Sequence, residues 1–358
     1  MLLPVDRPPR ILITRTDRIG DLVLSTPVFQ VLREKYPGAW LSCLTFLENQ
    51  EIVKGNPFLD EIILYDKKGS EKGFWGNLRF AHGIARRKFD VVIHLHATNR
   101  MHWVGWLAKI PVRIGWDRKC PWAINHAYQD VKKKGLQHEV EYNFDLLQFL
   151  GVEKPESLKT FFPVQERSRR SLENLLRNHQ VSLDRGLVIL SPGASCPSKR
   201  WPARRFGELI NGIRQKQEVT FIAIGTSEDQ SLVRQIQQVA DQPVLDLSGR
   251  LNLGMLGALF EKTALLISND SGPVHIASAL AVPVVSIFGR NDPGLSPTRW
   301  RPLGENSKVI WKDVGCEKCL AHRCEINFLC MDAVSVAEVL KAAESLLEPS
   351  FEKVKGTR

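Results

Sequence analysis

Residues 263–290 constrain the fold of this chain more than any other stretch. They read TALLISNDSGPVHIASALAVPVVSIFGR: an aliphatic run, a break at DSGP, a short apolar helical pattern and a second apolar run. Buried parallel strands are typically continuous apolar runs, and proline suits the first turn of a helix, where its missing N–H costs no hydrogen bond. The pattern predicts a strand, a tight turn, a helix starting near Pro273 and a second strand, which together form a βαβ unit.

The turn of this unit is a candidate anion site. The unpaired N–H groups of a helix N-terminus carry partial positive charge, and α/β sheets bind phosphate outside the carboxyl ends of their strands. Asp270, Ser271 and Gly272 lie in the turn, and His275 lies in the first helical turn. An ordinary capped helix gives the same pattern, with Asp270 or Ser271 as N-cap and His275 on the surface.

The same alternation of apolar runs and amphipathic helical patterns extends along both halves of the chain. With 358 residues the chain is too long for one typical core, and its pattern loosens between Gly151 and Arg185. We therefore expect an α/β protein with two Rossmann-like domains, whose mostly parallel sheets face each other across a cleft. The expected domains are residues 1–165 and 166–331. A C-terminal helix and basic tail, 332–358, are expected to pack back towards the N-terminal domain.

The composition indicates a folded protein without a secretion or membrane signal. The N-terminal MLLPVDRPPR has prolines and arginines where a signal peptide needs an apolar core, and no apolar run approaches the roughly 20 residues that span a bilayer. We therefore expect a cytoplasmic protein. The net charge of +10 is compatible with an anionic partner or with a solvated basic surface.

Two more loops follow predicted strands in the second half. Residues 191–202, SPGASCPSKRWP, bring small residues together with Lys199 and Arg200, although they lack the ending of a P-loop. In GTSED, Glu228 is a candidate acceptor for ribose hydroxyls, as an acid is in dinucleotide folds. Helix capping explains each loop equally well alone. Together with DSGPVH they predict a site for a nucleoside diphosphate.

The first half offers an acid and a set of cations. Asp21 lies at a predicted helix start, where it either caps the helix or, facing a cleft, accepts a proton from an attacking hydroxyl. Basic residues gather at predicted strand ends, where they are candidates for binding an acidic acceptor, although solvated loop residues give the same pattern. They are Arg15, Arg18, Arg100, Arg118 and Lys119.

The chain has seven cysteines, and this odd number argues against a disulfide framework. Four of them lie close together near the C-terminus. They are Cys316, Cys319, Cys324 and Cys330, spaced C-x2-C-x4-C-x5-C. A structural zinc site, a disulfide formed on oxidation and reduced thiols are all compatible with this spacing, which lacks the long loop of common zinc ribbons.

Three motifs in order resemble the family 9 glycosyltransferases, the lipopolysaccharide heptosyltransferases. They are R-x-D-R-I-G-D-x-V-x-S-T-P at Arg15–Pro27, S-P-G-A-x-x-x-x-K-R-W-P at Ser191–Pro202 and S-N-D-S-G-P-V-H-I-A at Ser268–Ala277. The resemblance covers nearly the whole chain and includes a cysteine-rich segment near its end. It implies a GT-B fold, with the acceptor bound by the first domain and the nucleotide-sugar by the second.

The resemblance also implies a reaction. This is an inverting transfer of heptose from ADP-L-glycero-D-manno-heptose to the inner core of lipopolysaccharide, with no metal or other cofactor. Asp21 matches the family's proposed general base, Lys199 the lysine that holds the donor phosphates, and Ser195 a hydroxyl near them. Asp270, Ser271, Gly272 and His275 match the loop that grips the pyrophosphate and sugar. Glu228 matches the ribose-binding acid in a register ambiguous by one residue.

The expected partners are therefore the nucleotide-sugar and a lipid A–core oligosaccharide, with peripheral contact between basic residues of the first domain and the inner membrane. A GT-B transferase or epimerase that uses a UDP- or GDP-sugar remains an alternative, because residues that bind the phosphates do not distinguish one nucleotide base from another. A non-catalytic scaffold for anionic lipid or nucleic acid is a second alternative, disfavoured because little aromatic–basic interleaving is visible. The sequence does not determine the heptose position, the acceptor or the oligomeric state.

Overall fold

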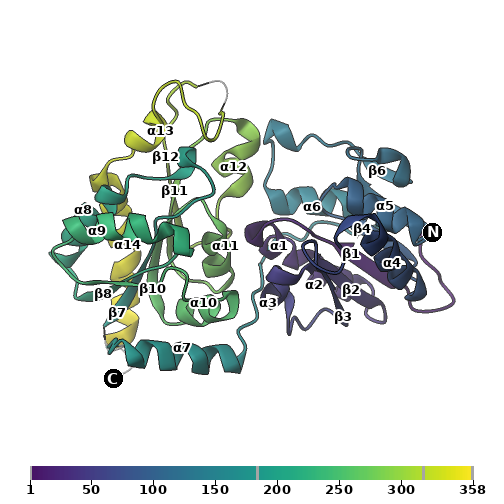
Figure 1. Ribbon diagram of the computed structural model, residues 1–358, viewed down its shortest axis with the longest axis horizontal. Coiled ribbons are helices and arrows are strands. Elements are labelled where there is room, and N and C mark those ends of the chain that lie inside the picture. The colour runs from purple at the N-terminus through teal and green to yellow at the C-terminus, as the bar shows by residue number, and fades with distance from the viewer. Residues whose placement is uncertain (1, 183–184, 317–318, 356–358) are drawn as a thin grey trace. The chain divides into compact units, whose positions relative to one another are not determined.

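The structure, a computed structural model, describes residues 2–182, 185–316 and 319–355. The chain divides into two compact units, Met1–Pro163 and Val164–Arg358 (Figure 1). The division falls two residues before the predicted boundary. Each unit is a parallel sheet covered by helices, as expected for the α/β class.

The first unit contains a six-stranded sheet in the order β3-β2-β1-β4-β5-β6. Its strands are β1 (Arg10–Thr14), β2 (Trp40–Phe46), β3 (Glu61–Tyr65), β4 (Val91–His94), β5 (Val112–Trp116) and β6 (His126–Tyr128). Its helices are α1 (Ile19–Val23), α2 (Thr26–Lys35), α3 (Gln50–Val53), α4 (Gly73–Arg86), α5 (Asn99–Leu107) and α6 (Glu139–Leu147).

The second unit contains a six-stranded sheet in the order β12-β11-β10-β7-β8-β9. Its strands are β7 (Gly186–Ser191), β8 (Val219–Ala223), β9 (Val244–Asp246), β10 (Thr263–Asn269), β11 (Val284–Phe288) and β12 (Ser307–Trp311). Its helices are α7 (Glu166–Asn178), α8 (Ala203–Arg214), α9 (Gln230–Val239), α10 (Leu253–Phe260), α11 (Gly272–Ala279), α12 (Pro297–Trp300), α13 (Leu329–Asp332) and α14 (Val336–Lys355).

The two sheets have the same doubly wound topology. In each, the chain starts at a central strand, builds outward to one edge, and returns to build outward to the other. The order therefore reverses between β1 and β4, where Thr14 pairs with His94, and between β7 and β10, where Ser191 pairs with Ser268. Ligands of open α/β sheets bind at such a switch point, beside the carboxyl ends of the two strands.

Helices cover both faces of each sheet. In the second unit α8, α9 and α14 lie on one side of the sheet, and α10 and α11 lie on the other (Figure 1). In the first unit the buried faces of α4 and α5 form one core with β1–β4, to which Ile84 and Val104 contribute. Continuous apolar runs such as ILIT and VVIH fill both sheets, because both of their faces are buried.

The structure differs from the expectations at the sheet edges and at one helix. The edge strands β6 and β12 were not predicted, and the helix predicted at Asp21 forms two helices, α1 and α2, separated by Leu24 and Ser25. Ser25 Oγ donates to the Asp21 carbonyl at 2.8 Å, which satisfies a backbone group beside this break.

The C-terminal helix α14 packs on the core of its own unit, so the expectation that it packs back towards the N-terminal domain was wrong. Its residues Val339, Ala343 and Leu347 recur every fourth position and are fully buried in the core of the second unit, beside α8. This apolar stripe completes one face of the second sheet, so it is not available to the first unit. The expected basic tail lies beyond the residues whose side chains the structure describes.

No helix within the described residues is both long enough and apolar enough to cross a membrane.

A buried histidine pair lies at the switch point of the first sheet. His94 ends β4 and His102 lies on α5; both are at most 1 % exposed, and their ring centroids are 4.8 Å apart. Thr14 Oγ1 lies 2.9 Å from His94 Nδ1. Burial, followed by the charges of His102 and Arg113, lowers the pKa of His94 well below its usual value, and burial also lowers the pKa of His102. Both rings therefore stay neutral in the fold at pH values where the unfolded chain binds protons.

This pair predicts a loss of stability in mild acid. Below a pH of about 6.5 the unfolded chain takes up protons that folded His94 does not, so the free energy of unfolding falls as the pH falls. Between pH 7 and 5 one such histidine contributes about 2 kcal/mol. We expect His94→Gln to remove this part of the pH dependence in urea unfolding measured at both pH values. His82→Gln, at an exposed position of α4, is the control, and an unchanged pH dependence in His94→Gln would contradict the assignment.

Candidate functional site

In the second unit, Asn269 joins the loops that follow β7 and β10. Its side chain is fully buried; Oδ1 accepts from the Trp201 N–H at 3.0 Å, and Nδ2 donates to the Pro192 carbonyl at 2.7 Å. One amide therefore binds both loops at the carboxyl edge of the sheet. This places the residues of SPGASCPSKRWP and DSGPVH side by side, as the sequence predicted.

Lys199 and Asp270 form an ion pair at this edge. Lys199 ends a short 3-10 helix, η5 (Pro197–Lys199), and Asp270 directly follows β10. Their side chains are 12 % and 8 % exposed, so the pair is largely shielded from solvent. A lysine ammonium thus lies beside the turn that leads into α11.

The start of α11 is arranged as an anion-binding helix terminus. Ser271 is the N-cap in extended conformation, and its side chain makes no capping hydrogen bond; its Oγ lies 3.1 Å from Ser268 Oγ instead. Gly272 and Pro273 form the first turn, and His275 follows within α11, 4 % exposed. Pro273 has no N–H and the Val274 N–H donates to the Ser271 carbonyl at 3.2 Å, so the Gly272 N–H is the first-turn group that the helix offers to an anion, as helix starts do in other α/β proteins.

The two adjacent acids of the third loop, Glu228 and Asp229, have different environments. Asp229 is buried and caps its own helix, since Oδ2 accepts from the Thr226 N–H at 2.8 Å and from Thr226 Oγ1 at 2.9 Å. Glu228, the predicted ribose ligand, is exposed. A Cβ on Gly193 would lie 2.5 Å from Asp229 Oδ2, so this loop packs directly against the loop that carries Lys199. Ser195, in that same loop, is exposed as well.

The thiol-rich segment supports the Lys199 loop. The Ser198 N–H donates to the Ala321 carbonyl at 3.2 Å. A Cβ on Gly289 would lie 2.2 Å from the Ser198 carbonyl oxygen and 2.6 Å from Met331 Sδ, so glycine alone lets these segments meet. The position of Lys199 therefore depends on chain segments well beyond its own loop.

The cysteine cluster contains free thiols. Cys330 is buried, and burial raises the pKa of its thiol. At Cys319 burial also acts to raise the pKa, but hydrogen bonds from the Ala321 backbone, Ser198 and Arg290 together outweigh it and lower the pKa. All seven cysteines are unpaired. Within the described ranges, no group of three or more His, Cys, Asp or Glu side chains is placed to hold a metal ion. The zinc interpretation thus finds no preformed site there.

In the first unit, Arg15 is a buried cation at the end of β1. It is 1 % exposed, and its guanidinium pairs with Asp17 at 2.9 Å, with Asp21 at 2.7 Å and with Glu139 at 3.1 Å. Asn143 Oδ1 accepts a further hydrogen bond at 3.0 Å. We expected Arg15 to bind an acceptor, but its burial removes it from reach, and it instead fixes Asp21. The Asp21 side chain is 15 % exposed.

The neighbours of this cluster have shifted pKa values. Burial raises the pKa of Asp17 well above its usual range, although the Arg15 guanidinium opposes this effect. His96 Nδ1 lies 3.5 Å from Asp17 Oδ2. Burial and then the charge of Arg15 lower the pKa of His96 to about 4. At neutral pH the His96 ring is therefore uncharged and able to accept or donate a hydrogen bond.

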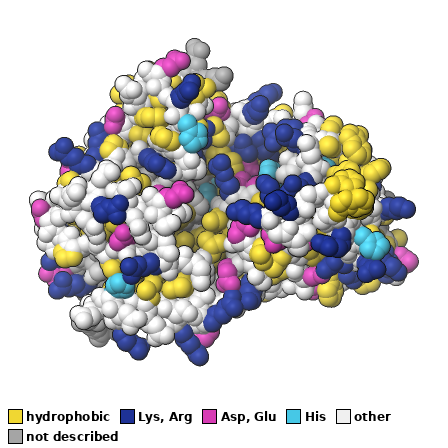
Figure 2. Space-filling view, viewed as in Figure 1, with side chains coloured by type: hydrophobic (Ala, Val, Ile, Leu, Met, Phe, Trp, Pro, Cys, Tyr) yellow, Lys and Arg dark blue, Asp and Glu magenta, His cyan; other side chains and the backbone are white. Residues whose placement is uncertain are grey.

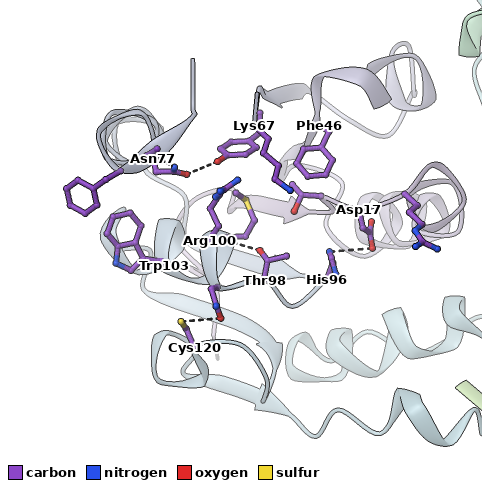
Figure 3. A pocket seen from close by; sticks show the side chains of 16 residues that line it. Asp17, Phe46, Lys67, Asn77, His96, Thr98, Arg100, Trp103 and Cys120 are labelled. Carbon is purple, nitrogen blue, oxygen red and sulfur yellow. Dashed lines mark hydrogen bonds and ion pairs between the residues drawn. The ribbon is translucent and has the colours of Figure 1, made fainter. Parts of the chain in front are cut away.

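A pocket of about 870 Å³ opens beside these residues within the first unit. Asp17 and His96 lie at one end and Trp103 at the other (Figure 3). Arg100 lies between them, 5.6 Å from the ring centroid of Tyr65. Sugars pack on aromatic faces and anions pair with guanidinium groups, so this lining suits a polar, negatively charged ligand. The other lining residues are Thr16, Arg18, Phe46, Tyr65, Lys67, Gly73, Phe74, Asn77, Thr98, Asn99, Met101 and Cys120.

The predicted cations separate into three groups. Arg18 and Arg100 line the pocket, Arg15 is buried, and Arg118 and Lys119 are exposed outside the pocket lining. Arg118 pairs with Asp130 at 3.0 Å.

Sequence reasoning missed Lys67 and His96, which line the same pocket. Both follow the carboxyl ends of strands, β3 and β4 respectively, so the rule that located Arg100 also applies to them.

Two Rossmann-like units, each with a parallel sheet that reverses its strand order at a switch point, make up the GT-B fold. The sequence profile of "Glycosyltransferase family 9 (heptosyltransferase)" matches residues 77–329. The chain belongs to this glycosyltransferase family. The profile match includes the second and third sequence motifs and Lys199.

Individual relatives agree. Lipopolysaccharide heptosyltransferase 3 of Escherichia coli K12 is 26 % identical over 347 residues, which cover 92 % of this chain and 95 % of that protein. The crystal structure of a family 9 glycosyl transferase from Veillonella parvula is 25 % identical, with a TM-score of 0.81 over 95 % of this chain and 98 % of its own. The E. coli heptosyltransferase WaaC with ADP has a TM-score of 0.68 at 17 % identity, over 94 % and 99 %.

The contact at Gly289 yields a prediction. In Gly289→Ala the new methyl group displaces Ser198 and with it Lys199. For the ADP site proposed below, we therefore expect ADP to bind roughly tenfold more weakly in calorimetric titration, a loss of about 1.4 kcal/mol. Gly83→Ala is the control, because the nearest atom to its new Cβ is Arg87 Nη1 at 3.9 Å. Equal ADP affinity in Gly289→Ala and the parent would show that the Lys199 loop does not depend on this packing.

Proposed function

We propose that this chain transfers heptose from ADP-L-glycero-D-manno-heptose to the inner core of lipopolysaccharide. Family membership supports heptosyl transfer, and curated relatives are named lipopolysaccharide heptosyltransferases. The observation that carries the proposal is the Lys199–Asp270 pair beside the uncapped start of α11, an arrangement suited to a pyrophosphate.

In this proposal the second unit binds the donor. Lys199 and the Gly272 N–H at the start of α11 bind the pyrophosphate oxygens, and His275 approaches the sugar side of the leaving group. The Ser195 hydroxyl binds near the phosphates. Glu228 accepts from the ribose hydroxyls; its exposure leaves its carboxylate available for this contact. Asp270 orients Lys199.

The proposed reaction is a direct displacement with inversion. Asp21 takes the proton of the acceptor hydroxyl, the acceptor oxygen bonds to the anomeric carbon, and ADP leaves with the electrons of the broken C–O bond. Arg15 holds Asp21 in place. We propose that the charge developing on ADP is balanced by Lys199 and the helix N-terminus without a metal ion.

The first unit binds the acceptor in this scheme. Arg18 and Arg100 line the pocket and face anionic groups of the core oligosaccharide, while Arg118 and Lys119 contribute positive charge outside it. Because lipid A anchors such an acceptor in a bilayer, we propose a cytoplasmic enzyme in peripheral contact with the inner membrane.

The base is tested by Asp21→Asn, which keeps the shape and a hydrogen bond to Arg15 but does not accept a proton. We expect transfer to fall by roughly 10²- to 10⁴-fold, the usual contribution of a general base, with ADP affinity unchanged. Asp21→Ala gives the same loss of transfer, together with lower stability, because it leaves Arg15 with one fewer buried partner. Full activity in Asp21→Asn would overturn the assignment, and weakened ADP binding would show a structural role.

The donor is tested by thermal unfolding with ADP, UDP and GDP side by side. A ligand present at about 100 times its Kd stabilises by about 2.7 kcal/mol, so the preferred nucleotide gives the largest rise in Tm. We expect that rise with ADP and its loss in Lys199→Ala, while Lys308→Ala, at an exposed position of β12, behaves like the parent. A larger rise in Tm with UDP or GDP would show that the donor carries that nucleotide instead of ADP. No rise in Tm with any of the three would reject the nucleotide site.

A further inference from the structure

Large aromatic side chains are exposed on one face of the first unit. Trp75 is 77 % exposed, Phe74 and Trp122 are each 60 % exposed, and Trp106 is 45 % exposed. They come from the start of α4, from α5 and from the 3-10 helix η2 (Pro121–Ala123). The opposite face of α4 supplies Ala81 and Ile84 to the core, so the fold does not require the outward aromatic rings.

These side chains form connected groups. Phe74 contacts Trp75 and, across the helices, Trp103, with ring centroids 5.3 and 5.7 Å apart, and Trp106 contacts Trp122 at 5.3 Å. Trp103 and Trp106 are one turn apart on α5, which links the two groups. A shallow groove of about 410 Å³, lined by Trp75, Leu78 and Leu107 among others, runs along the same helices.

Positive charge is concentrated around these rings. Residues 72–125 contain ten Lys and Arg but only two acids, Asp90 and Asp117, so this stretch holds a net +8 of the +10 of the whole chain. Asp90 pairs with Arg7, while Arg87 and Arg118 pair with acids outside the stretch, Glu61 and Asp130, so eight of its ten cations lie outside these two pairs. Figure 2 shows hydrophobic side chains gathered over the region of α5 and β6, with lysine and arginine beside them.

We propose that this face, the aromatic–basic surface formed by α4, α5 and η2, docks onto an anionic phospholipid bilayer. Tryptophan rings settle at the headgroup level of membranes, and each nearby lysine or arginine gains from the negative surface potential. Protein interfaces are depleted of lysine, so the mixture of Trp with Lys72, Lys109 and Lys119 favours lipid over a protein partner.

The inference rests on the proposed function, because an enzyme with a lipid-anchored acceptor has to reach the membrane surface. Phe74 and Trp103 belong to the surface and also line the 870 Å³ pocket. Docking by this face therefore places the mouth of the candidate acceptor pocket at the level of the lipid headgroups. The sugar of a lipid-anchored acceptor can then enter the pocket while its acyl chains stay in the bilayer.

Vesicle co-sedimentation tests the surface. The full chain is mixed with vesicles of phosphatidylcholine, alone or with phosphatidylglycerol, and we expect binding to the anionic vesicles that weakens as salt rises. Each cation contributes about 1 kcal/mol at such a surface, so Arg79→Glu with Arg86→Glu lowers the affinity by roughly 25-fold or more. Trp75→Ala with Trp122→Ala lowers it severalfold.

Matched variants on the second unit serve as controls. Lys308→Glu and Trp311→Ala alter an exposed lysine and a 36 % exposed tryptophan on β12, and both bind vesicles like the parent. Equal binding by the surface variants and these controls would overturn the proposal. So would a dimer in the parent that the surface variants lose, without vesicle binding.

A transfer assay separates this inference from the proposed function. With ADP-heptose as donor, the surface variants lose activity on an acceptor embedded in vesicles but retain it on the same acceptor freed of its acyl chains. If the parent transfers to neither acceptor yet binds anionic vesicles through this face, the proposed reaction fails and the surface stands. If the parent transfers to both but the surface variants do too, the surface proposal fails alone.

Discussion

One buried guanidinium organises the first unit. Arg15 faces Asp17, Asp21 and Glu139, and the Lys132 ammonium joins Glu139 at 2.8 Å, so three carboxylates share two cations in a largely buried cluster. Removing a cation from such a cluster leaves buried charge uncompensated, at a cost of about 3–5 kcal/mol. Because these residues come from the end of β1, from α1 and from α6, one side chain joins the switch point of the sheet to the helices on either side of it.

Much of the fold follows from the sequence because the buried strands are continuous apolar runs separated by turn residues. The segment from β10 to β11 shows both signals and folds as predicted. Two of the four edge strands lack them: β6 has three residues and none buried, and β12 follows a proline-rich stretch. The packing of α14 was not predictable from its own pattern. An apolar stripe indicates that one face of a helix is buried, but it does not indicate which sheet the helix packs against.

The candidate sites show the same limit. The rule that parallel strands end at one edge predicted that Lys199 and Asp270 would meet, and they form an ion pair. It could not distinguish buried Arg15 from exposed Arg18, because burial depends on α6, far along the chain. Nor did the sequence reveal the aromatic–basic surface: Trp75, Trp106 and Trp122 lie on three separate elements, so aromatic and basic residues do not interleave along the chain.

The Lys199–Asp270 pair has a consequence for the proposed donor site. The Asp270 carboxylate already offsets the lysine charge, so the pair presents little net positive charge to an incoming anion. In the proposed complex the pyrophosphate takes over from Asp270 as the counter-ion of Lys199 and accepts from the Gly272 N–H at the start of α11. On this proposal the affinity of a ligand depends on how many of these contacts it makes at once, and a chloride ion makes fewer of them than a pyrophosphate.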